Sequence, residues 1–126
     1  MILRQKIKQF SVLLIQKRLQ ADPAYLDSFL TFREIRYCVA KRHPAEPAAA
    51  RLAAKQACLA LLKIPAAQKK WLLHIEICKK NNGQPFFKFS PQLKAKIKLS
   101  DAVPLLSLAH ERKMAIAWVA QVKARK

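Results

Sequence analysis

Glycine is almost absent from this sequence, and its scarcity limits the folds and sites that the chain can form. Gly83 is the only glycine in 126 residues, whereas an average composition would supply about nine. Walker loops and Rossmann fingerprints each need several glycines so that the backbone can approach a phosphate closely. Both nucleotide-binding motifs are therefore excluded. Any phosphate site must be built from side chains or from the N-terminus of a helix.

The charge balance is strongly basic, and the composition is typical of one folded domain. Lys and Arg number 25 against 7 Asp and Glu, a formal net charge of +18, and 52% of the residues are hydrophobic. That hydrophobic content excludes a disordered chain, and the length predicts a single domain over residues 1–126. The charge favours nucleic acid, an anionic membrane, or an acidic protein with a phosphate-rich ligand as partner.

The cysteines and the N-terminus indicate a soluble cytoplasmic protein. Cys38, Cys58 and Cys78 are evenly spaced without a CxxC pair, which predicts reduced, buried thiols and leaves a nucleophilic cysteine as the alternative. The apolar run at residues 10–15 is too short for a signal peptide or for a transmembrane helix, which needs about 20 apolar residues. We therefore expect no membrane span.

Helical patterns occupy much of the chain. The segment 48–63, AAARLAAKQACLALLK, is rich in Ala and Leu and predicts the longest helix. Thr31 and Glu34 have the spacing of a capping box, which predicts a helix start at that point. Two further segments are expected to be helical, residues 10–19 and 91–98.

Alternating patterns predict two antiparallel strand pairs. Residues 71–89 are expected to form a hairpin, and 105–110 is expected to pair with 113–122. The last strand is apolar on both faces, which indicates burial on both sides or packing against another subunit. Residues 2–8 fit either a strand or the start of a helix. The expected fold class is α+β, an antiparallel sheet packed by the long helix.

Four segments carry a recognisable pattern. They are FLTFREIRYC (Phe29–Cys38), RLAAKQACLALL (Arg51–Leu62), HIEICKKNNGQPFFKF (His74–Phe89) and LSLAHERKMAIAWV (Leu106–Val119). In order and spacing they resemble the motifs of the holo-acyl-carrier-protein synthase family of small phosphopantetheinyl transferases, over roughly 95 residues, a span typical of a domain. The resemblance implies a 4′-phosphopantetheinyl transferase-like fold and a homotrimer with cofactor sites between neighbouring subunits.

The reaction implied by this resemblance is a phosphoryl transfer. The family moves 4′-phosphopantetheine from coenzyme A to a serine hydroxyl of an acyl carrier protein and releases adenosine 3′,5′-bisphosphate. Magnesium bridges the diphosphate and two protein carboxylates, where it neutralises charge on the phosphate oxygens. Coenzyme A is thus the expected substrate and an acyl carrier protein the expected partner, in either a fatty-acid or a polyketide pathway.

Both metal-binding carboxylates of the family pattern are missing here. Gln56 stands at the helix position, and ungapped counting back from the first motif puts Lys8 at the other. In one interpretation the Lys8 ammonium pairs with phosphate where magnesium would sit, and Gln56 adds a hydrogen bond without charge, so catalysis depends weakly or not at all on metal. In the other, the chain is an inactive relative that binds its carrier protein or an assembly partner. A third possibility is that Glu34 or Glu111 recruits a metal.

Further residues at motif positions are expected to contact the cofactor. His110 is expected beside the cofactor phosphates, where it would bind the diphosphate or help to position and deprotonate the serine hydroxyl; a structural histidine at a strand end is the alternative. Lys55 and Ser107 also match motif positions; the alternative for Lys55 is a solvated helix lysine, and the alternative for Ser107 is a packing role in the strand. The family's next helix lysine is replaced by Ala60, and Lys63 is close enough in sequence to substitute for it.

The resemblance also implies a basic docking surface for the acidic carrier protein on the first helix. Lys17 and Arg18 fit that role, whereas Asp22 and Asp27 nearby do not; a plain solvated face is the alternative. Charge alone supports a nucleic-acid-binding protein. Because neither a nucleic-acid motif nor an aromatic stacking set is present, we expect no specific nucleic-acid partner.

Overall fold

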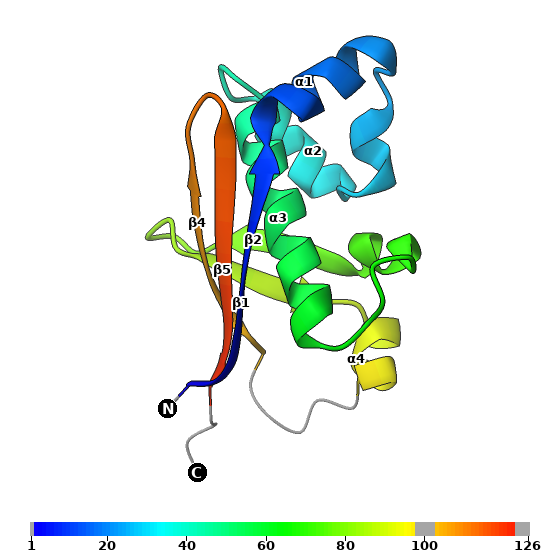
Figure 1. The fold of residues 1–126 in the computed structure, drawn as a ribbon, viewed down its shortest axis with the longest axis vertical. Coiled ribbons are helices and arrows are strands. Elements are labelled where there is room, and N and C mark those ends of the chain that lie inside the picture. The colour runs from blue at the N-terminus through cyan, green and yellow to red at the C-terminus, as the bar shows by residue number, and fades with distance from the viewer. Residues whose placement is uncertain (1, 98–102, 123–126) are drawn as a thin grey trace.

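A three-stranded antiparallel sheet forms one layer of the fold in the computed structural model, which describes residues 2–97 and 103–122. Its strands are β1 (Ile2–Ser11), β4 (Leu105–His110) and β5 (Met114–Val122), and β5 lies between the other two. A separate hairpin consists of β2 (Ile75–Lys79) and β3 (Pro85–Phe89). The hairpin crosses behind the long helix in the view of Figure 1.

The long helix α3 (Ala45–Leu61) covers one face of the three-stranded sheet (Figure 1). On that side β5 presents Ala115, Ala117 and Val119, which are fully buried, and α3 adds small side chains of its own to the same core. Small residues on both elements let the two backbones approach closely. The other side of β5 carries Met114 and Ile116, which are 40% and 39% exposed. Within one chain, this part of β5 is therefore covered only by α3.

Two helices and a short turn gather near the start of α3. The helix α1 (Val12–Ala21) is capped by Ser11, whose hydroxyl accepts a hydrogen bond from the Leu14 N–H at 3.1 Å. The 3₁₀ turn η1 (Tyr25–Ser28) then leads into α2 (Phe32–Val39). The first turn of α2 has the capping box expected from the sequence, because the side chains of Thr31 and Glu34 each accept from the other residue's backbone N–H.

The boundaries of α3 differ from the expected range 48–63. The helix begins earlier, with Pro44 as its N-cap and Pro47 in its first turn. Proline is tolerated there because the N–H groups of the first turn have no partner within the helix. It ends at Leu61 because Lys63 adopts the left-handed region at φ 60°. The Lys63 N–H then bonds to Ala60 O and the Ile64 N–H to Leu59 O, which is a Schellman ending.

The N-terminal segment is a strand, which decides between the two interpretations of residues 2–8. β1 also continues further than expected, to Ser11, so Phe10 pairs with Ala115 of β5 and lies outside α1. The sequence gives a weak strand signal here because β1 is an edge strand with mostly exposed side chains.

The second half of the chain follows the expected order with one shift. Residues 71–74 belong to the 3₁₀ turn η2 (Lys69–His74), so the hairpin strand starts at Ile75. The short helix α4 (Pro91–Ile97) is present; the last residue of its expected range, 98, lies outside the described part of the chain. The strand pair of β4 and β5 is confirmed.

The cysteines are free, and two of them are buried as expected. Cys38 and Cys58 lie in the core, and burial raises the pKa of the Cys38 thiol to about 11 and that of Cys58 further. Cys78 is half-buried, so the expectation of burial holds only in part for it. Among the described residues, no helix is both long enough and apolar enough to cross a membrane.

Candidate functional site

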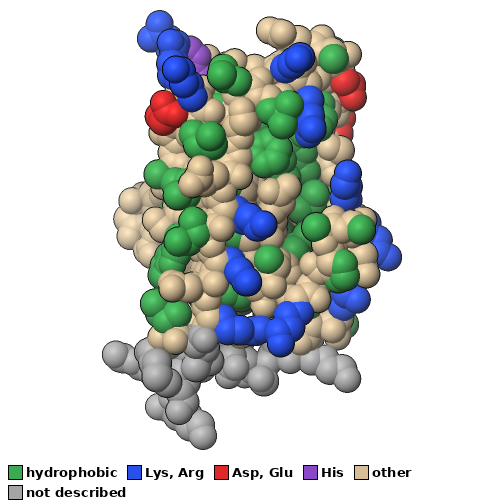
Figure 2. All heavy atoms as spheres, in the orientation of Figure 1, with side chains coloured by type: hydrophobic (Ala, Val, Ile, Leu, Met, Phe, Trp, Pro, Cys, Tyr) green, Lys and Arg blue, Asp and Glu red, His purple; other side chains and the backbone are tan. Residues whose placement is uncertain are grey.

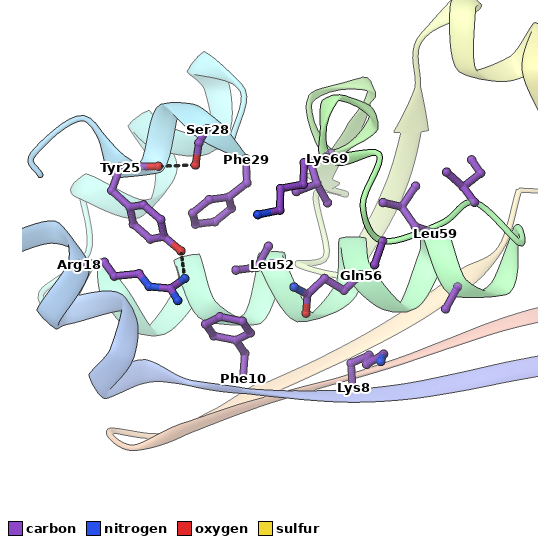
Figure 3. A pocket seen from close by; sticks show the side chains of 14 residues that line it. Lys8, Phe10, Arg18, Tyr25, Ser28, Phe29, Leu52, Gln56, Leu59 and Lys69 are labelled. Carbon is purple, nitrogen blue, oxygen red and sulfur yellow. Dashed lines mark hydrogen bonds between the residues drawn. The ribbon is translucent and has the colours of Figure 1, made fainter.

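A cavity of ≈ 480 Å³ opens between β1, α1, η1, α3 and η2. Much of its wall is apolar, formed by Phe10, Phe29, Leu52, Leu59, Ile64 and Leu72. Its polar lining consists of three cations, Lys8, Arg18 and Lys69, and three uncharged side chains, Gln56, Tyr25 and Ser28. In the view of Figure 3, Phe10 and Lys8 lie on the β1 side of α3, and Phe29 and Lys69 lie on its other side. The combination of apolar walls and converging cations is suited to an anionic group, because a low local dielectric strengthens electrostatic attraction.

Lys8 and Gln56 line the same cavity. This proximity is expected, because the two residues occupy the positions of the two metal-binding carboxylates in the family motifs. Lys8 pairs with Ala117 in the sheet, and because paired residues share a face, its side chain lies on the α3 side. Gln56 is half-buried on α3. Two residues 48 positions apart thus line the same space.

Arg18 lines the cavity in a fixed orientation. Its Nη1 donates to the Tyr25 hydroxyl at 2.9 Å, and its guanidinium carbon lies 5.6 Å from the centroid of the Tyr25 ring. Figure 3 shows this hydrogen bond at one end of the space. The two residues expected to dock a carrier protein are therefore separated: Lys17 is exposed on α1 without lining the cavity, whereas Arg18 points along it.

Lys69 lines the cavity, although no motif in the sequence identifies it as a site residue. It follows α3 in η2 and lies at the cavity on the side opposite Lys8 and β1 (Figure 3). Lys63, which was expected to contact the cofactor, is exposed at the end of α3 and is not among the residues that line this space. The irregular segment between α3 and β2 brings Lys69 back, and no motif or periodicity predicts its path.

Lys55 lies in the core, which contradicts both interpretations of it as a cofactor contact or a solvated lysine. Its side chain is 0% exposed, and Nζ donates to Glu34 Oε1 at 2.6 Å, Phe29 O at 2.7 Å and Leu72 O at 3.0 Å. Three acceptors match the three N–H bonds of an ammonium. Burial lowers the pKa of Lys55, and the Glu34 carboxylate opposes that shift. Because the side chains of Phe29 and Leu72 line the cavity, Lys55 ties two of its walls to α3.

His110 lies at the end of β4 and contacts the first turn of α3. Its Nδ1 is 3.2 Å from Glu46 Oε1. With Tyr37, Lys41 and other residues it lines a second cavity of ≈ 340 Å³, which shares no lining residue with the first. One chain by itself therefore does not bring His110 to Lys8. Ser107 is exposed on β4, on the face of the sheet opposite α3.

Three cations surround the ring of Tyr37, which lines the second cavity. The Arg51 guanidinium carbon lies 4.1 Å from the Tyr37 ring centroid, and the ammonium groups of Lys41 and Lys79 lie 4.6 and 5.7 Å from it. Burial by itself raises the pKa of the Tyr37 hydroxyl, but the three cations outweigh burial and lower it. The Glu46 carboxylate lies beside His110 in the same cavity, so the cations gather around Tyr37 and not around the histidine.

The magnesium ion implied by the family resemblance does not fit the residues of the first cavity. Magnesium in proteins is held through carboxylates, whereas the two expected positions carry the ammonium of Lys8 and the neutral amide of Gln56. Among residues 2–97 and 103–122, no cluster of three His, Cys, Asp or Glu residues is placed to hold a metal.

The two acidic residues considered as metal recruiters are committed elsewhere. Glu34 is 1% exposed, and its oxygens accept from Lys55, from the Thr31 N–H and from the Ile77 N–H. Glu111 accepts two backbone N–H groups in the turn between β4 and β5. Neither carboxylate lines the cavity of Lys8 and Gln56.

Together these features define an α+β protein with a cavity beside its long helix that is lined by three cations and no acidic residue. No family model matches the chain. It is 34% identical over 110 residues to a holo-[acyl-carrier-protein] synthase of Cytophaga hutchinsonii, covering 83% of this chain and 85% of that protein. A synthase of the same name from Moorella thermoacetica is 29% identical over 108 residues, with 83% and 84% covered.

Solved structures of proteins with the same name share the fold of this chain. The holo-[acyl-carrier-protein] synthase of Helicobacter pylori in complex with coenzyme A superposes with a TM-score of 0.81 at 24% identity, covering 94% of this chain and all of the other. The synthase from Neisseria meningitidis gives a TM-score of 0.84 at 22% identity, with 97% and 100% covered. The chain belongs to the holo-[acyl-carrier-protein] synthase family, and the expected fold is confirmed.

Proposed function

We propose that this chain transfers 4′-phosphopantetheine from coenzyme A to a serine of an acyl carrier protein. The observation that carries the proposal is the match to a named synthase over 83% of the chain, in a fold whose cavity gathers Lys8, Gln56 and two further cations. The cavity would take the diphosphate of coenzyme A, whose negative charge suits its lining. Because the donor set does not suit magnesium, the protein's own side chains must position the phosphates.

His110 is the candidate base for the serine hydroxyl. If its Nδ1–H donates to Glu46 at the observed 3.2 Å, Nε2 keeps a lone pair that can accept a proton. The carboxylate would fix the tautomer and orient the ring, as an orienting acid does in other histidine bases. Within one chain, His110 and Lys8 line different cavities. We therefore propose that His110 of one subunit meets Lys8 of a neighbouring subunit, as the family's intersubunit sites imply. Ser107, on the outer face of the same strand, would then lie near that boundary.

The outer face of the three-stranded sheet supports a homotrimer. It carries exposed apolar side chains on all three strands, namely Ile7 at 58%, Leu105 at 50%, Met114 at 40% and Ile116 at 39%. Figure 2 shows hydrophobic side chains along the edge that β4 and β5 occupy. Contiguous exposed apolar surface is a common mark of a protein interface, and closed symmetry would bury it in every subunit.

The basic surface supports an acidic carrier protein as partner. Figure 2 shows Lys and Arg side chains spread over the face that carries β1, with few acidic ones. Lys17 is exposed on α1 and available for docking. We place the reaction in the cytoplasm, because free thiols such as Cys38 and Cys58 suit a reducing compartment.

A second candidate function is a catalytically inactive partner that still binds carrier protein. The replacement of both metal-binding carboxylates by Lys8 and Gln56 favours it. The two candidates differ in whether coenzyme A is consumed.

Release of adenosine 3′,5′-bisphosphate separates the two functions. The chain would be incubated with coenzyme A and an apo acyl carrier protein, and the nucleotide quantified by chromatography. The transferase proposal requires release with the intact carrier and none with a carrier whose acceptor serine is changed to alanine. Binding of the carrier without release, under conditions in which a reference transferase modifies it, would establish the inactive partner.

A further inference from the structure

We propose that Lys8, Lys69 and Arg18 together bind the diphosphate of coenzyme A directly, so that ligand binding at this cavity is independent of magnesium. The identity of the ligand rests on the proposed function. The site itself rests on three cationic side chains that come from β1, η2 and α1 and line one space.

The three cations have no acidic counterpart at the cavity. None of the residues that line it is Asp or Glu. The ion pairs found in the described part of the chain join Lys55 to Glu34 and His110 to Glu46, and neither involves the three cations. Like charges around a shared, partly apolar space repel each other unless an anion binds among them. The cavity is therefore prepared for a group that carries more than one negative charge.

Each cation contributes differently to such a site. The Lys8 and Lys69 ammonium groups act as mobile point charges with three donors each, whereas a guanidinium offers paired donors to phosphate oxygens. Arg18 is already oriented by the Tyr25 hydroxyl at 2.9 Å. Lys8 and Gln56 lie toward one part of the space and Arg18 with Tyr25 toward its end, with Lys69 on the far side (Figure 3). A diphosphate between them would meet donors from several directions.

Replacing the two carboxylates and the metal by Lys8 and Gln56 raises by one the positive charge that the ligand meets. Two carboxylates and one divalent cation are together neutral, whereas Lys8 and Gln56 carry one positive charge without any metal. Lys69 supplies a further positive charge to the cavity from η2. Ala60 carries no charge, and Lys63 is exposed and does not line the cavity. A divalent ion would have to approach an ammonium to reach the same place, which like-charge repulsion opposes.

The test is the affinity of the full chain for coenzyme A, measured by calorimetry with a chelator and again with magnesium. We expect the two affinities to agree within about twofold, and Lys8→Met and Lys69→Met each to weaken binding by about tenfold or more, as for loss of a charged hydrogen bond. The matched control is Lys80→Met in the hairpin turn, which removes the same charge from an exposed position outside the cavity and should change affinity less than twofold.

A reverse substitution sharpens the test. The double variant Lys8→Asp/Gln56→Glu restores two carboxylates, and we expect its affinity to rise by about tenfold when magnesium is added, because a bound ion would then bridge protein and phosphate. Circular dichroism checks that each variant is folded. A wild-type affinity that itself rises about tenfold with magnesium, or lysine variants that bind as well as the control, would overturn the inference.

Carrier-protein modification measured in the same samples keeps this inference distinct from the proposed function. Metal-independent binding without transfer would leave the inference standing and refute the transferase. Transfer together with a coenzyme A affinity that rises about tenfold with magnesium would support the transferase and refute the inference.

Discussion

Replacing Lys55 by methionine is expected to destabilise the protein severely. The substitution removes an ammonium that is 0% exposed and lies 2.6 Å from the Glu34 carboxylate. It leaves that carboxylate as an unpaired buried charge, and it also removes the donor to the carbonyls of Phe29 and Leu72. Breaking a buried pair in this way costs about 3–5 kcal/mol. A domain of this size has about 5–15 kcal/mol of stability in total, so much of it would be lost.

Urea unfolding followed by the fluorescence of Trp71 and Trp118 measures this loss. With an m-value of about 2 kcal/mol per molar urea, a loss of about 4 kcal/mol lowers the midpoint by about 2 M. All samples need one protein concentration, because an oligomer unfolds with a concentration-dependent midpoint. Lys80→Met, at an exposed position, is the control and should change stability by less than about 0.5 kcal/mol.

A double variant shows whether Glu34 is the cause. Glu34→Gln removes the charge that Lys55→Met leaves behind, so the double variant should be less destabilised than the sum of the two single variants by about 1–3 kcal/mol. The reasoning would be refuted if Lys55→Met lost less than about 1 kcal/mol and bound coenzyme A weakly. That result would return Lys55 to the role of a phosphate contact.

Three further outcomes are expected. Lys63→Gly should raise stability by about 1 kcal/mol, because the residue adopts φ 60°, where a side chain is strained and glycine is not; an unchanged or lower urea midpoint would contradict the Schellman ending. In the native protein a thiol reagent at pH 8 should modify Cys78 alone and slowly, because burial raises the thiol pKa of Cys38 and Cys58 most, whereas all three should react in denaturant; rapid native labelling of Cys58 would contradict its burial. Ile116→Lys should convert the proposed trimer to monomer in sedimentation, since it places a charge on the proposed apolar interface; an unchanged sedimentation coefficient would exclude this face from the contact.

Local patterns in the sequence predicted most of the elements. The capping box at Thr31 and Glu34 was readable because its partners are three residues apart, and it formed as expected. The range of α3 was misjudged at both ends, because Pro47 is tolerated in a first turn and because Lys63 takes a conformation usually left to glycine. Neither effect appears in hydrophobic periodicity.

The site was predicted only where a family motif reached it. Motif positions led to Lys8 and Gln56, and the fold places both at one cavity. They also suggested Lys55 as a cofactor contact. A lysine in a helix of alanines gives no sign of the three acceptors that distant segments supply to it. Lys69 was missed because its position depends on the path of the chain between α3 and β2. Contacts between distant segments, rather than local propensity, decide these cases.

The intact mass of an apo acyl carrier protein, after incubation with this chain and coenzyme A in the presence of a chelator, tests the central claim most directly. The account predicts a mass increase of one phosphopantetheine group, equal in rate within about twofold to that with magnesium, because Lys8, Lys69 and Arg18 hold the diphosphate without an ion. No increase with several carriers in either condition, while a reference transferase modifies the same carriers with magnesium, would contradict the account.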